Sequence, residues 1–211
     1  MPEGPVFHDL DATLTELIQR ELPSSMVPQI SVSFATPGSD FPGATVLPAI
    51  NLFLYDIVEN KDLRSRQPIE ARAVTGTAEI HGKTVEVAPG TVVRALAPVR
   101  VDCHYLVTTW AKPVGQPEQV EHRLLGYVLR ALLRHREIPT AMLQGVLRRQ
   151  PFPIRAAAIQ GDVHRPRGDF WQALGGKPRP CFDYRVTVCV ELGDIDLLGP
   201  VAWGSSIGGA S

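Results

Sequence analysis

The chain has 211 residues, which is enough to bury one substantial hydrophobic core, and no linker divides it. Its formal net charge is −1, with acidic and basic residues mixed along the chain, so no overall basic field attracts nucleic acid. The sequence has no run of about 18 apolar residues that could span a bilayer and no basic segment of a signal peptide. We therefore expect synthesis in the cytosol without a signal peptide, and no membrane partner.

Three elements are predicted in the first sixty residues. Residues 5–22 place leucine and isoleucine at helical spacing, and Pro23 ends this helix. Residues 30–34 alternate apolar and polar side chains, which predicts a half-buried strand. After a turn-rich loop, residues 49–58 are apolar on both faces, as in a central strand that is covered on both sides.

The polar region between residues 59 and 97 is predicted to carry an arm. Thr77–Ile80 and Thr84–Val87 form a small hairpin around His81-Gly82-Lys83. A connection this long that has structure of its own is more often a functional arm than a linker. We place the arm at about residues 74–94.

The organising stretch of the chain runs from residue 98 to residue 136. A strand comes first, with residues 99, 101, 103, 105 and 107 on the core face and Arg100, Asp102 and His104 on the other face. A long helix over 118–135 follows, and its polar residues form only a narrow solvent stripe that includes Glu121. Because Leu125, Leu129 and Leu133 widen its apolar face, this helix needs cover on two sides, and the second cover can be another subunit.

The rest of the chain predicts a strand, a short helix, another strand and a tail. Residues 154–160 form a weak, alanine-rich strand, and residues 167–174 form a helix with Asp169 as its N-cap. Residues 182–192 alternate clearly, with Asp183 and every second residue after it facing out. The predicted fold is α+β, a mixed, largely antiparallel sheet with flanking helices. It comprises one domain, residues 1–192, and a Gly/Ser-rich tail, residues 193–211.

The predicted core of this domain combines the helix with two strands. Its central residues are expected to be Tyr105, Leu124, Val128, Leu132 and Val186, because each lies on the apolar side of its element.

No pattern in the sequence predicts catalysis, a cofactor or a metal site. Gly204-Ser205-Ser206-Ile207-Gly208 fits the pattern of a nucleophile elbow. That motif also requires a strand before it and an acid and a histidine after it, and the sequence predicts none of these. The six histidines and three cysteines (Cys103, Cys181, Cys189) lack metal-ligand spacing, and an odd cysteine count argues against a disulfide framework. We expect a protein that is not an enzyme; an unrecognised small enzyme remains an alternative.

Arginines gather between residues 148 and 167, with aromatic residues nearby. This group comprises Arg148, Arg149, Arg155, Arg165 and Arg167. A solvated surface is the first interpretation, a docking face for an acidic protein partner is the second, and a nucleic-acid-binding module is the third.

Three short motifs, in matching order between Val6 and Leu192, resemble one known family. The first is Asn51-Leu52-Phe53-Leu54-Tyr55 with Asn60 and Leu63-Arg64. The second is Asp102-Cys103-His104-Tyr105-Leu106 with Arg123-Leu124-Leu125-Gly126, and the third is Phe170–Gly175 with Tyr184. Together they are similar to the cap, or tail-terminator, proteins of extracellular contractile injection systems, which are phage-tail-like particles of the antifeeding-prophage type.

The resemblance implies a structural role and specific partners. A protein of this family forms a hexameric ring on the distal end of the inner tube and sheath, ends their polymerisation and anchors the sheath. The implied partners are further copies of the chain, the inner tube protein and the sheath protein, in a particle that either stays in the cytosol or is released. We expect the interfaces to include Arg64, Arg66, Arg123, Arg130, Arg148, Arg149, Leu197, Leu198 and Trp203.

The apolar residues of the tail give a separate expectation. Leu197, Leu198 and Trp203 are an unusual apolar load for a glycine-rich terminus. We expect the tail to be held across a neighbouring subunit or along a sheet edge by strand addition; the alternative is that it folds back on its own subunit.

Overall fold

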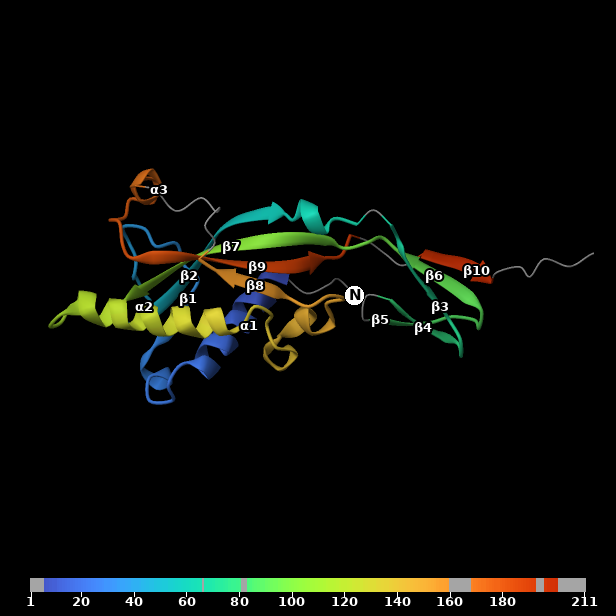
Figure 1. The fold of residues 1–211 in the computed structure, drawn as a ribbon, viewed down its shortest axis with the longest axis horizontal. Helices are drawn as coiled ribbons and strands as arrows, with labels where there is room; N and C mark the ends of the chain where they lie inside the picture. The colour runs from blue at the N-terminus through green and yellow to red at the C-terminus, as the bar shows by residue number, and fades with distance from the viewer. Residues whose placement is uncertain (1–5, 66, 81–82, 160–167, 193–195, 201–211) are drawn as a thin grey trace, which may run out of the picture.

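A five-stranded sheet in the order β1-β2-β7-β9-β8 forms the centre of the computed structural model (Figure 1). The structure describes residues 6–65, 67–80, 83–159, 168–192 and 196–200. β1 runs parallel to β2, and the other neighbouring pairs are antiparallel. The strands are β1 (Ser31–Ser33), β2 (Ala49–Glu59), β7 (Val99–Trp110), β8 (Arg155–Ala158) and β9 (Cys181–Val190). The predicted α+β class, with a mixed and largely antiparallel sheet, is confirmed.

Two long helices, α1 (Val6–Glu21) and α2 (Pro117–Arg134), cover one face of this sheet (Figure 1). Their apolar sides meet the inward-facing residues of β2, β7 and β9 in one continuous core. Short 3-10 turns complete this layer, among them η1 (Val27–Gln29), η3 (Thr140–Met142) and η4 (Gly145–Arg149). All five residues predicted to form the core are fully buried there: Tyr105, Leu124, Val128, Leu132 and Val186.

The opposite face of the sheet is covered as well, as predicted for β2 but not for β7 and β9. Asp102, His104 and Asp183 were expected to face solvent, yet each is less than 10% exposed. The loop before β2 packs Phe41 on Trp110 with ring centroids 4.4 Å apart. The short helix α3 (Gly168–Ala173) packs Phe170 edge-on against Tyr55 at 5.7 Å. The alternation therefore predicts correctly which residues share a face of the sheet, but its prediction that this face is exposed to solvent is wrong.

This loop and the segment after α3 also touch each other. A Cβ on Gly38 would lie 2.8 Å from the backbone oxygen of Leu174, so only glycine fits at this contact. Asp169 lies in the first turn of α3, which begins at Gly168, so its predicted role as N-cap is wrong. Glu121, predicted to lie in the solvent stripe of α2, is also mostly buried, because its carboxylate accepts from the Ala111 amide at 3.1 Å and pairs with Arg179 at 3.0 Å.

The predicted hairpin exists and belongs to a larger arm at one end of the main sheet (Figure 1). The hairpin is β4 (Thr77–Ile80) with β5 (Lys83–Glu86). Beside it lies a second sheet in the order β10-β6-β3, made of β3 (Ile69–Arg72), β6 (Thr91–Ala95) and β10 (Asp196–Pro200). The arm therefore spans residues 69–95, longer than expected, and the predicted tail contributes a strand to it.

Candidate assembly surfaces

The residues predicted to form interfaces lie in four separate parts of the chain. Arg123 and Arg130 lie on α2, and Arg148 and Arg149 lie on η4, beside α1. Arg64 follows β2 in the chain and forms a two-point ion pair with Glu59. Leu197 and Leu198 lie in β10, where the Leu197 side chain is exposed. Arg66, Trp203 and the Gly204–Gly208 motif lie outside the described residues.

The outer side of α2 carries apolar side chains that nothing in the described chain covers. Tyr127 is 38% exposed and Leu133 is 51% exposed. Leu129 and Leu133 line a shallow hollow of about 400 Å³ together with Gly126. This is the side of the helix for which the sequence predicted a second cover.

Packing within the subunit does not require a glycine at position 126. No atom lies within 4 Å of the place where its Cβ would stand. A glycine within a helix is less stable than alanine by about 0.5–1 kcal/mol. The missing side chain therefore leaves helix backbone open for a contact from outside the subunit.

A second hollow joins the start of α2 to one edge of the sheet. It measures about 340 Å³ and lies between α2 and the segment around η1 and β1. Its lining is mostly apolar and includes Met26, Ile30, Val120 and Tyr127. Since β1 is the first strand of the sheet order, the open side of α2 continues onto a free sheet edge.

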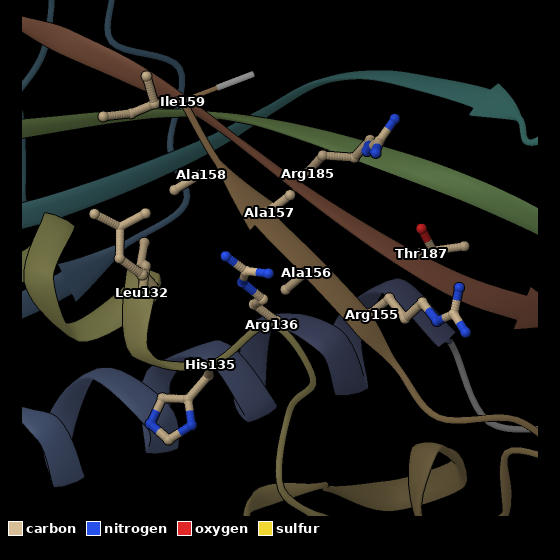
Figure 2. A pocket seen from close by; sticks show the side chains of 11 residues that line it. Leu132, His135, Arg136, Arg155, Ala156, Ala157, Ala158, Ile159, Arg185 and Thr187 are labelled. Carbon is tan, nitrogen blue, oxygen red and sulfur yellow. The ribbon is translucent and has the colours of Figure 1, made fainter. Parts of the chain in front are cut away.

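The other outer strand of the sheet, β8, lies beside charged side chains. A groove of about 480 Å³ runs between β8 and the end of α2 (Figure 2). Three arginines line it: Arg136, Arg155 and Arg185. Of these, only Arg155 belongs to the arginine group predicted from the sequence, because the pairing that brings Arg136 and Arg185 to the same groove is not a local pattern.

The motif residues on the covered face of the sheet form a hydrogen-bonded network. The Tyr55 hydroxyl donates to Asp183 at 2.6 Å, and the Thr187 hydroxyl donates to Asp102 at 2.6 Å. The Asn60 amide donates to both Asp102 oxygens, at 3.1 and 3.2 Å. Burial and the nearby Asp183 carboxylate raise the pKa of Tyr55, so the phenol stays a donor. These hydrogen bonds link β2, β7 and β9 to one another and to Asn60, which follows β2.

Burial raises the pKa of the Cys103 thiol to about 12, which keeps it protonated and unreactive. Within the described ranges, no group of three or more His, Cys, Asp or Glu residues is placed to hold a metal ion. In the same ranges, no helix has the length and apolar character needed to cross a membrane.

The fold is similar to that of a sheath/tube terminator and of a tube-terminating cap. The whole chain superposes on the sheath/tube terminator of an extracellular contractile injection system, PVC, in its extended state, with a TM-score of 0.63 and 23% identity. A second match is the tube-terminating cap of the anti-feeding prophage, with a TM-score of 0.62, 23% identity and 93% of this chain covered. The chain covers 65% and 59% of those two chains, less than two thirds of either.

The family assignment agrees with the fold. Residues 9–196 match the model of the Pvc16 N-terminal domain, and the chain belongs to this family. The resemblance to caps of contractile injection systems is thereby confirmed. No curated protein matches the chain in sequence.

Proposed function

We propose that this chain is the cap, or terminator, subunit of a contractile injection system. It forms a ring on the distal end of the inner tube and sheath, ends the polymerisation of both and anchors the sheath. The observation that carries the proposal is the fold, which over the full length of the chain is similar to a sheath/tube terminator and over 93% of it to a tube-terminating cap.

The surfaces of the subunit support self-association into a closed ring. A head-to-tail contact joins two different surfaces and gives a ring when the rotation closes. The open side of α2 offers one surface next to the β1 edge, on which the apolar side chains of Tyr127, Leu129 and Leu133 lie beside Arg123, Arg130 and Arg134. Covering this surface with a neighbouring copy would remove exposed apolar area from water, at about 25 cal/mol per Å². Six copies per ring is the stoichiometry we propose, on the family resemblance.

A structural rather than enzymatic role is supported by the state of the polar groups. Tyr55, Asn60, Asp102 and Asp183 hydrogen-bond within the fold instead of converging on an open cleft. Nucleic-acid binding through residues 148–167 is less well supported. The Arg148 side chain donates to the Leu143 backbone oxygen at 2.8 Å and to Gln144 at 3.2 Å, so it is engaged within the subunit.

The proposal is tested by complementing a particle-producing strain that lacks this chain. Wild-type protein should restore particles with a cap and a uniform sheath length in electron micrographs. Gly126→Leu should fail to do so, whereas the matched control Gly126→Ala should succeed, because alanine meets no atom within the subunit and favours the helix. Uniform, capped particles with Gly126→Leu would exclude this helix side from the ring. Normal particles without the chain would refute the cap function itself.

A further inference from the structure

Two arginines on the open side of α2 have no acidic partner within the described ranges of the chain. Arg123 and Arg130 are exposed and stand seven residues apart, so they share one face of the helix and lie about 10 Å apart along its axis. Gly126 and Tyr127 lie between them on the same face. Arg134, one turn further on, is already paired with a carboxylate at the end of α1, at 2.9 Å. The hollows along this side of α2 contain no Asp or Glu.

The hairpin of β4 and β5 presents two carboxylates on its outer face. Its register sets Glu86 opposite Thr77 and Glu79 opposite Thr84. These four side chains are exposed and share one face of the hairpin, whereas the residues between them lie on the inward face. The two glutamates occupy diagonal positions, about 7–8 Å apart. Neither of them forms an ion pair with any described residue, so this face is acidic and open to a partner.

Within one subunit these two surfaces lie apart along the longest axis of the molecule. Figure 1 shows α2 in the left half of the view and the hairpin in the right half, beyond the end of the main sheet. The hairpin is fixed there, because Lys83 on its inward face donates to Glu191, the residue after β9, at 2.8 Å. A contact between the two surfaces therefore joins two copies of the chain. Since the surfaces differ, this contact is head to tail and can repeat around a closed ring.

We propose that the outer face of the β4–β5 hairpin of one copy binds the open side of α2 of the next copy. The inference rests on the proposed ring and names the two surfaces that form it. The two glutamates pair with Arg123 and Arg130, which form strong two-point contacts with carboxylates. The spacings of the two pairs differ by about 3 Å, and the flexible side chains of both residue types take up this difference.

The rest of the contact is made by small and apolar groups. The threonines beside the glutamates are small enough to lie over the helix backbone that Gly126 leaves open, and their methyl groups pack on Tyr127. This part supplies affinity that ion pairs at a surface do not, because exposed pairs contribute little by themselves. The charges supply the specificity. Two α2 surfaces, or two hairpins, would oppose like charges, so only the head-to-tail pairing is favourable.

Exchange of charge between the two surfaces tests the proposal, with self-association measured by sizing with light scattering. Arg123→Glu with Arg130→Glu should weaken self-association at least about tenfold, and Glu79→Arg with Glu86→Arg should do the same. An equimolar mixture of these two variants should associate again, because each copy then meets opposite charge on both sides. A ring of six copies allows the two variants to alternate. Circular dichroism and urea unfolding would confirm that both variants are folded.

The control is Lys61→Glu with Lys177→Glu, which makes the same change of charge at exposed positions outside both surfaces and should leave self-association unchanged. Variants that associate like wild type, or a mixture that stays as dissociated as its two components, would overturn the proposal. A wild-type chain that stays monomeric would overturn it as well. The cap function is tested separately in particles, so a ring that persists in every variant would refute this contact alone.

Discussion

Truncating each of two neighbouring leucines at the end of α2 should have very different effects on the free energy of unfolding. Leu132 is 1% exposed and lies in the main core, whereas Leu133 is 51% exposed on the open side of the helix. Truncating a buried leucine to alanine costs about 2–5 kcal/mol, depending on how far the site can collapse. Because Leu132 also lines the groove beside β8, water and neighbouring side chains can partly fill the space. We therefore expect a loss near the lower end, about 2–3 kcal/mol.

The matched control is Leu133→Ala, which removes the same atoms one residue further on. Its effect on the free energy of unfolding should stay within about 0.5 kcal/mol, as for most surface changes. Urea unfolding of both variants, followed by circular dichroism at a concentration where wild type is dissociated, measures the difference without a contribution from assembly. Equal losses in the two variants would refute the assigned orientation of α2 and with it the open apolar side.

Three further predictions concern other parts of the subunit. Tyr55→Phe should lower the free energy of unfolding by about 1–3 kcal/mol, since it leaves a buried Asp183 oxygen without its donor; Tyr127→Phe is the control, and equal effects would contradict the network. Hydrogen bonds from His135 and then Arg134 hold the pKa of Glu21 below its ordinary value of 4.5. The stabilisation that this gives is present above 4.5 and lost as pH falls through the lower, folded value. The cost of Glu21→Gln should therefore vanish in strong acid, and an acid-unfolding comparison that shows a constant cost would disprove the linkage. Deleting residues 194–211 removes β10, so amide exchange at Val92–Arg94 should accelerate; particles that still assemble with a cap and normal sheath length would exclude the tail from the interface.

The parts of the fold with strong local periodicity could be predicted from the sequence. In β7 and α2, runs of twelve and eighteen residues keep one period, so the core residues Tyr105, Leu124 and Leu132 follow from the pattern alone. The hairpin of β4 and β5 was predicted for the same reason, since a turn between two short alternating runs is a local signal. These elements can be predicted without knowing which segments pack against them.

The parts that depend on distant segments could not be predicted. Whether Asp102 and His104 face solvent depends on the loop before β2 and on α3, each about sixty residues away in the chain. β6 pairs with β10, about one hundred residues later, and neither strand has a long alternating run. The interface residues were predicted one by one from charge and apolarity. Their separation into four parts of the chain, and the approach of Arg136 to Arg185 in one groove, depend on the sheet topology.

The two outer strands of the main sheet differ in a way that bears on how the subunit can assemble. β1 adjoins an apolar hollow that continues onto Tyr127, and β8 adjoins three arginines. The β8 groove and the open side of α2 are continuous, because Leu133 lines both hollows. A ring contact that covers Leu133 would therefore also cover one end of the β8 groove. It follows that Arg136→Glu with Arg155→Glu should weaken self-association, measured by sizing with light scattering, because the ring contact extends into the groove; unchanged association would show that the contact ends at Leu133.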